Sequence, residues 1–198
     1  MARIPGVAAR EAGPEIASTL DYARDMMAQI AGRPAERGAE PIEVIAHAPE
    51  LLRGLMAHQQ AAAQANRVPT RLKHLAELKA ATLTNCEYCI DLGSQVSRRA
   101  GLSDEELLAL PTYRASPLFS ELEKLVLDYA VGVTRTPVDV SDELFARLRA
   151  HFDPAQLVEL THAIALENLY GRCNHALGIG SAGFSEGMVC AVPERAPR

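Results

Sequence analysis

Residues 117–134 read PLFSELEKLVLDYAVGVT, and the spacing of their apolar side chains indicates the fold class. Steps of four, three, four and four residues place five of them on one stripe, which is the pattern of an amphipathic α-helix. The stripe consists of Leu118, Leu122, Leu125, Tyr129 and Val133. Because no β-branched run alternates with period two, no strand is expected. We therefore predict an all-α protein, with a single domain of seven or eight helices over residues 1–198.

Capping signals predict where four of these helices begin. A side-chain oxygen followed three residues later by Glu or Gln satisfies free amides of the first turn, and proline is tolerated at the first helical position. The predicted caps are Ser103 with Glu106, Ser116 before Pro117, Ser141, and Asp153 before Pro154 with Gln156. Further helices are expected near 14–30, 49–66 and 70–83. Gly, Pro and mixed charges predict a flexible linker over 31–40 and a loose tail over 185–198.

The composition is that of an ordinary globular protein and excludes several functions. Of the 198 residues, 48 % are apolar and 23 % are charged, and the formal net charge is −5. No stripe of Lys and Arg is available to neutralise phosphates, so no nucleic-acid partner is expected. No apolar run approaches the roughly 18 residues of a membrane helix, and the few cysteines do not suffice for a disulfide scaffold. We expect a cytoplasmic protein without a membrane partner.

The stretch LTNCEYCIDL over residues 83–92 contains the candidate reactive groups. Asn85 is a good N-cap, which would put Cys86 in the first turn of a helix and Cys89 one turn later. Three residues at about 100° each leave both sulfurs on one face, close enough to bridge. The free amides at a helix start stabilise a thiolate, which is the reactive form. Cys86 and Cys89 are therefore predicted to cycle between dithiol and disulfide.

Two structural alternatives exist for this pair. Cysteines three residues apart on a helix also serve as small buried hydrophobes. Zinc would need two further ligands, and the compact candidates, Cys173 and His175, face opposite sides of a helix, so no metal is expected. No cofactor is expected either. Residues 178–183 superficially resemble a dinucleotide fingerprint, but they follow a helix rather than a strand.

Around the pair, residues 71–81 (RLKHLAELKAA) followed by 85–89 (NCEYC) resemble the carboxymuconolactone decarboxylase and alkylhydroperoxidase D superfamily. Residues 166–168 and 174–179 resemble the closing helix of its longer members. The resemblance covers roughly residues 41–180. It implies an alkylhydroperoxidase D-like helical fold, a homo-oligomer, and peroxidase members that reduce hydroperoxides with the CxxC pair.

The sequence departs from the family pattern at two positions. In that pattern a glutamate twelve residues before the first cysteine and a histidine four residues after the second move protons to and from the thiols. Here His74 occupies the first position and Gly93 the second. His74 is a candidate proton acceptor because imidazole titrates near neutral pH. Asp91 and Glu87 are further candidates near the pair, although a carboxylate also disfavours a neighbouring thiolate.

These features favour a thiol-disulfide oxidoreductase of alkylhydroperoxidase type. Cys86 and Cys89 would be its catalytic residues, a hydroperoxide its substrate and an external dithiol its reductant. The alternative is a non-catalytic or redox-sensing helical oligomer, or a small-molecule binder of the same family, which the two relay substitutions favour. Lactone decarboxylation is a weaker option, because members that perform it generally lack the CxxC pair. A reactive pair would form a disulfide with peroxide at neutral pH, whereas buried core cysteines would not react.

Overall fold

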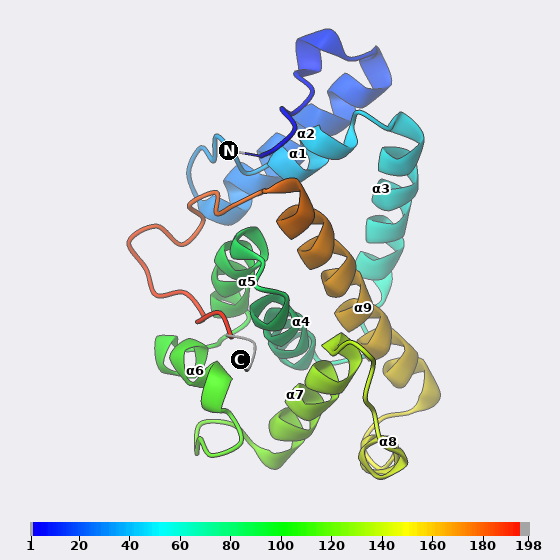
Figure 1. Ribbon diagram of the computed structural model, residues 1–198, viewed down its shortest axis with the longest axis vertical. Coiled ribbons are helices and arrows are strands. Elements are labelled where there is room, and N and C mark those ends of the chain that lie inside the picture. Colours follow the sequence, from blue (N-terminus) through cyan, green and yellow to red (C-terminus); the bar gives the residue numbers. More distant parts are fainter. Residues whose placement is uncertain (1, 195–198) are drawn as a thin grey trace.

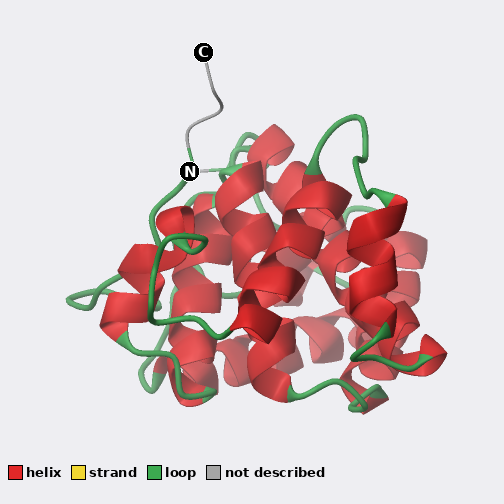
Figure 2. Cartoon of the chain, turned by 90° about the horizontal axis from the view of Figure 1, so that it is seen from below, coloured by secondary structure: helices red, strands yellow, loops and turns green. Residues whose placement is uncertain are grey.

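The computed structural model describes residues 2–194, and every regular element among them is helical (Figure 2). In chain order the elements are η1 (Ala9–Glu11), α1 (Pro14–Ala31), α2 (Glu40–Ile45), α3 (Pro49–Gln64), α4 (Thr70–Thr84), α5 (Glu87–Arg99), α6 (Asp104–Ala109), η2 (Leu110–Thr112), α7 (Glu121–Thr134), α8 (Asp142–Arg149) and α9 (Pro154–Leu177). The all-α class is confirmed. The described residues form nine α-helices rather than seven or eight, and two of these, α2 and α6, have only six residues each. None of the helices in this range combines the length and apolar character needed to cross a membrane.

Helix α4 lies at the centre of the molecule and packs against α5, α7 and α9 (Figure 1). Its apolar side chains divide between two cores. Leu75 and Leu78 belong to the core that α5 and the two cysteines share. Leu72, Ala76 and Ala80 belong to the core that α7 and α9 share. Because α4 is buried on both faces, it determines how α5 and α9 lie relative to each other.

The N-terminal helices enclose a third, smaller core. Leu20 of α1, Ile42 of α2 and Leu52 of α3 are buried together there. Beyond Leu52, α3 runs beside α9, where His58 contacts His162 (Figure 1). A cavity of about 630 Å³ lies between α3, α4 and α9. This part of α3 is therefore packed less tightly than the helices around α4.

Three of the four predicted caps are confirmed. The starts of α6, α8 and α9 have the predicted cap residues, with capping boxes at α6 and α9. The prediction of a helix start at Ser116 is wrong. Its Oγ accepts a hydrogen bond from the Leu118 amide in a turn, and α7 begins four residues later than predicted, behind Ser120. Ser120 forms a capping box with Glu123, which satisfies amides at both ends of the first turn, whereas a Ser-Pro step does not.

The segments predicted as a flexible linker and a loose tail are both in contact with the helical body. Between α1 and α2, Ala39 is buried and the Gly38 carbonyl accepts a hydrogen bond from the Tyr88 hydroxyl at 2.5 Å. In the tail, the Ala191 amide donates to Ser94 Oγ at 3.0 Å. Both segments are irregular, as their composition predicts, but hydrogen bonds from α5 hold their backbones in place. Residues 195–198 of the predicted tail lie outside the described residues.

Candidate active site

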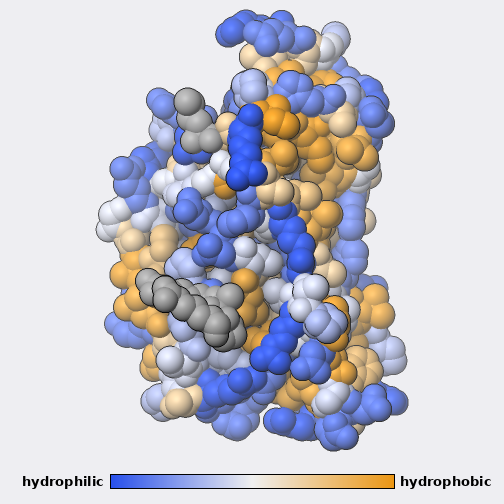
Figure 3. Space-filling model, in the orientation of Figure 1, coloured by the Kyte–Doolittle hydropathy of each residue, from blue (hydrophilic) through white to orange (hydrophobic). Residues whose placement is uncertain are grey.

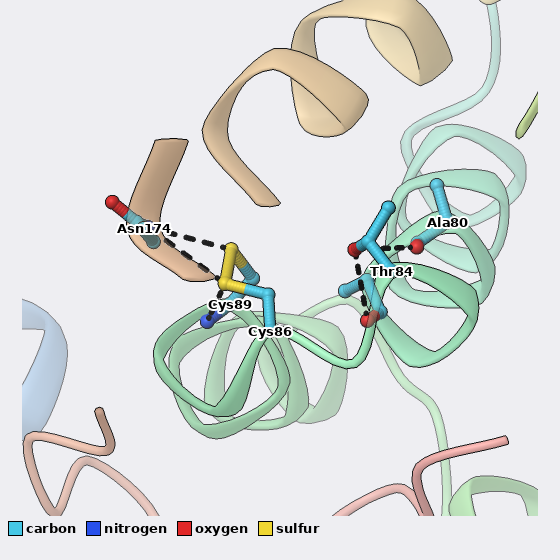
Figure 4. The surroundings of a disulfide bond; sticks show 6 residues. Ala80, Thr84, Cys86, Cys89 and Asn174 are labelled. Carbon is cyan, nitrogen blue, oxygen red and sulfur yellow. Dashed lines mark hydrogen bonds between the residues drawn. A yellow bond between two sulfur atoms is a disulfide. The ribbon is translucent and has the colours of Figure 1, made fainter. Parts of the chain in front are cut away.

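The two cysteines lie where α4 ends and α5 begins (Figure 4). Cys86 is the N-cap residue of α5 and Cys89 lies in its first turn. The two form a disulfide, with a Cα–Cα distance of 5.2 Å. That distance is within the range of about 4.4–6.8 Å that a bridge requires. Cys86 is 1 % exposed and Cys89 is 7 % exposed. The predicted geometry of the pair is therefore confirmed.

The prediction that Asn85 caps this helix is wrong. Asn85 ends α4 instead, in the left-handed region with φ of 55°. Asn adopts this region more readily than most residues, and the turn lets α5 fold back onto α4. Cys86 takes the cap position, where its Sγ accepts a hydrogen bond from the Cys89 amide at 3.2 Å. Since this sulfur lies at the positive end of the α5 dipole, the reduced form would favour a thiolate at Cys86.

A side chain from the closing helix completes the surroundings of the disulfide. Asn174 of α9 directs its Nδ2 at the two sulfurs, 3.7 Å from Cys86 Sγ and 3.6 Å from Cys89 Sγ (Figure 4). Asn174 is only 5 % exposed, so water does not compete freely for this donor. A buried amide donor stabilises negative charge on either sulfur. Sequence reasoning did not single out Asn174, because it lies 85 residues from Cys89.

Asp91, two residues after Cys89, faces away from the sulfurs and binds the loop that follows α9. Its Oδ2 accepts from Ser181 Oγ and from the amides of Ala182, Gly183 and Phe184, and its Oδ1 accepts from the Ser185 amide. These five distances run from 2.6 to 3.0 Å. Asp91 is 4 % exposed. The structure gives Asp91 the role of a loop anchor, and its role in proton transfer stays a prediction.

The structure does not bring His74 to the sulfurs. Its half-buried ring lies one turn from Glu77 on α4, and His74 Nδ1 is 2.9 Å from Glu77 Oε2. Ten residues separate His74 from the end of α4, which is about 15 Å along the helix axis. Gly93 faces α4 as well, where a Cβ would lie 3.1 Å from Leu78 Cδ1. The proton-accepting role of His74 therefore stays a prediction, and any proton on its Nδ1 would be shared with Glu77.

The other reactive side chains lie apart from the pair. Cys173 is an exposed free thiol on α9, and Cys190 is a half-buried free thiol in the tail. Within residues 2–194, no three His, Cys, Asp or Glu side chains are grouped as ligands for a metal ion. Gly178 ends α9 in the left-handed region with φ of 69°, so the glycine-rich stretch over 178–183 is a helix terminus and turn, as predicted.

Residues 49–131, from α3 into α7 and including the cysteine pair, match the Carboxymuconolactone decarboxylase family. The resemblance to this family that the sequence predicts is confirmed over these residues. An uncharacterized relative, YnjA of Escherichia coli K12, is 42 % identical over 125 residues, which are 63 % of this chain and 65 % of YnjA. The match thus spans about two thirds of that relative's length.

Two solved structures share the fold. A protein of unknown function from Agrobacterium tumefaciens, named for the antioxidant defence protein AhpD, has a TM-score of 0.65 at 28 % identity over 70 % of this chain and 94 % of its own. A peroxidase-related AhpD-core protein from Ralstonia eutropha JMP134 has a TM-score of 0.71 at 17 % identity over 91 % of this chain and 92 % of its own. At that identity the second likeness shows the fold alone. The AhpD-like helical fold is confirmed.

Proposed function

We propose that this protein is a dithiol peroxidase, which reduces organic hydroperoxides with Cys86 and Cys89 and is restored by an external dithiol. The observation that carries the proposal is the placement of the pair at the start of α5, at bridging distance and beside the Asn174 amide. A structural role alone would need neither a buried amide donor for both sulfurs nor a helix start beneath them. The resemblance to the Carboxymuconolactone decarboxylase family, and the likeness to a protein of unknown function named for the antioxidant defence protein AhpD, support the same interpretation.

The chemistry requires one proton to move at each stage. A cysteine thiolate attacks one oxygen of the hydroperoxide, the O–O bond breaks, and the leaving alkoxide takes a proton to become an alcohol. The sulfur is oxidised to a sulfenic acid. The second thiol then attacks this sulfur, the S–O bond breaks, water leaves, and the disulfide forms. An external dithiol reduces the disulfide by exchange and is itself oxidised.

The residues around the cysteine pair have defined parts in this reaction. The α5 amides and Asn174 stabilise the attacking thiolate, and burial of the pair limits loss of the sulfenic acid to further oxidation. The short Cα–Cα distance of 5.2 Å lets the second sulfur reach the first without a change of the backbone. Asn174 is accordingly expected to touch the reacting atoms, and Asp91 to hold the loop beside them.

The test is turnover of tert-butyl hydroperoxide with dithiothreitol as reductant. Wild type should consume peroxide catalytically, and Cys86→Ser and Cys89→Ser should each fall to the uncatalysed rate. Cys173→Ser removes an exposed thiol outside the site and should keep wild-type activity. The single-cysteine variant that still consumes one equivalent of peroxide retains the attacking cysteine. Asn174→Ala should slow thiolate formation and lower the rate roughly 10-fold, about the value of one hydrogen bond to a charged group.

The same assay decides against the alternative. If reduced wild type forms the Cys86–Cys89 disulfide with peroxide but does not turn over, the protein is a redox sensor rather than an enzyme. If the reduced pair does not react with peroxide at all, the proposal is wrong and the cysteines are structural.

We also propose that the protein acts as a homo-oligomer. Exposed apolar side chains gather along α3 and α9, where Leu51 is 61 %, Val158 69 % and Leu169 48 % exposed. Figure 3 shows apolar surface on the side where Figure 1 places α3. A second copy that covers these side chains would remove them from water.

A further inference from the structure

Three polar side-chain atoms of α9 are buried without a hydrogen-bond partner among the described residues. They are Glu167 Oε1, Asn168 Oδ1 and the Tyr170 hydroxyl. Such atoms are rare in folded proteins, because each loses its bonds to water without replacement, and they are often found where a protein binds or reacts. Asn168 has another explanation, since its Nδ2 donates to Thr134 Oγ1 at 3.0 Å and holds α9 against α7. Glu167 Oε1 has no such partner, whereas the Gln59 side chain of α3 lies near enough to the Tyr170 hydroxyl to lower its pKa.

Glu167 is the more costly of the two because it can carry a charge. Its Oε1 is buried, and the carboxylate of Glu77 on α4 is near enough to act on its pKa. Burial, and then the negative charge of Glu77, raise the pKa of Glu167 well above its usual value. No Lys or Arg forms an ion pair with it within residues 2–194. A buried carboxyl beside a second carboxylate keeps its proton to higher pH than a free one.

The remaining titratable groups around this carboxyl come from four helices. On α4, His74 is hydrogen-bonded to Glu77. On α5, Tyr88 has a pKa raised by burial and, in smaller part, by Glu167. Tyr170 on α9 itself has a pKa raised by burial; the Gln59 side chain of α3 opposes this rise, and Glu167 and Glu77 add to it. On α3, His58 contacts His162 of α9 rather than the carboxyl.

Glu167 shares one face of α9 with the residue that contacts the sulfurs. Seven residues, or two turns, separate Glu167 from Asn174, which is about 10 Å along the axis. Between them, α9 touches α4 at Gly171, where a Cβ would collide with Thr84, two residues before Cys86. Tyr170 lies one turn closer to the sulfurs than Glu167 and packs against the core that contains both cysteines. Glu167, Tyr170 and Asn174 thus follow one another along α9 toward the disulfide.

We propose that Glu167 is the proton reservoir of the cysteine pair and exchanges its proton with the reacting groups through the Tyr170 hydroxyl. The inference rests on the proposed peroxidase function. When a thiol ionises, its proton is taken up on the Glu167 carboxylate. When the O–O bond of the hydroperoxide breaks, the same proton is passed to the alkoxide, which leaves as an alcohol. The carboxylate is then ready for the proton of the second thiol, which leaves with the sulfenic oxygen as water.

This scheme requires a bell-shaped dependence of the oxidation rate on pH, because the active form holds one proton between the thiol and Glu167. At low pH both groups are protonated and no thiolate exists. At high pH both are ionised, and the alkoxide has no acid to protonate it. The falling limb therefore reports Glu167. Because Glu77 raises the pKa of Glu167, neutralising Glu77 should move that limb to lower pH.

The experiment measures disulfide formation in the reduced protein with tert-butyl hydroperoxide from pH 5 to pH 10. Glu167→Gln should lower the rate at the optimum about 100-fold, the size of a lost general acid–base group, and abolish the falling limb. Glu77→Gln should shift the falling limb to lower pH. Tyr170→Phe should lower the rate of disulfide formation but leave the falling limb of the pH profile in place. Glu159→Gln is the matched control, because that carboxylate lies on the same helix but is bound by Lys73 and the Arg67 amide. It should retain the bell shape.

A stability measurement separates this role from simple damage to the fold. Glu167→Gln removes a buried acid without a partner, so its free energy of unfolding should equal or exceed that of wild type at pH 8 while its rate falls. If the falling limb of the pH profile is unchanged in Glu167→Gln, the inference about Glu167 is wrong, but the proposed peroxidase function is not contradicted. If the reduced wild type does not react with the hydroperoxide, the peroxidase function fails and the reservoir fails with it.

Discussion

Replacing Asp91 by Ala tests whether one buried carboxylate holds the loop after α9. In the structure this carboxylate accepts five hydrogen bonds of 2.6–3.0 Å, one from a hydroxyl and four from consecutive backbone amides. Ala removes the acceptor and leaves those four amides without a partner. The loop also places Phe184 edge-on against Tyr88, with ring centroids 5.7 Å apart. Loss of the anchor should therefore reach the residue next to Cys89.

The size of the effect follows from these contacts. A hydrogen bond to a charged group is worth about 1.5–3 kcal/mol, so five of them would sum to roughly 8–15 kcal/mol if the loop had to remain in place. The loop can instead detach and let water satisfy its amides. The loss is then limited to the net anchoring energy plus exposure of Phe184, which costs about 1.5–3 kcal/mol. We expect Asp91→Ala to lower the free energy of unfolding by about 3–5 kcal/mol.

Urea denaturation followed by circular dichroism measures this loss. Asp91→Asn keeps one acceptor oxygen and should lose less than Asp91→Ala. Glu87→Gln removes an exposed carboxylate from the same helix and should change stability by under about 0.5 kcal/mol. Amide hydrogen exchange at residues 182–185 should be slow in wild type and fast in Asp91→Ala. A loss of under about 1 kcal/mol in Asp91→Ala, with these amides still protected, would refute the anchoring argument.

Three further predictions concern charge and assembly. Burial lowers the pKa of Lys79 even though Glu194 pairs with it, so the unfolded chain binds this proton more tightly than the folded protein does. The free energy of unfolding should therefore rise as pH increases from 7 toward 10. In urea titrations, Lys79→Met should lack that rise. Burial opposes ionisation of Glu159, but Lys73 and two backbone amides outweigh it and lower its pKa. Its contribution to stability should therefore disappear as pH falls below about 4.5, and a Glu159→Gln variant with wild-type acid sensitivity would contradict this. Light scattering should give a multiple of 21.4 kDa, reduced by Val158→Glu; a single-chain mass at micromolar concentration would argue against the oligomer.

The helices themselves were largely predictable because their signals are local. A Ser or Asp with Glu or Gln three residues later marks the starts of α6 and α9 wherever the rest of the chain lies. The errors arose where two local signals competed. Ser116 before Pro117 and Ser120 before Glu123 both resemble caps, and only packing selects between them. Asn85 is suited both to start a helix and to end one in the left-handed region, so its identity alone does not distinguish the two.

The candidate site divides in the same way. The two cysteines and their shared helix start are close in sequence, and a spacing of three residues is enough to predict their bridging distance. Asn174 and Glu167 are distant in sequence from the pair and belong to a different helix. Asp91 is close to the cysteines in sequence, but the direction of its side chain depends on where the loop over 181–185 returns to α5.

The sequence by itself determined the helical class, most helix boundaries and the pairing of Cys86 with Cys89, because periodicity, capping and i to i+3 spacing act over a few residues. Only the tertiary structure decided which donors surround the sulfurs and which carboxyls are anchored or left without a partner. Those outcomes depend on how α9 crosses α4 and α5, and that crossing is set by the small side chains of α4 and by Gly171 against Thr84. Contacts between residues about 85 to 94 positions apart are made by packing, which no local pattern records.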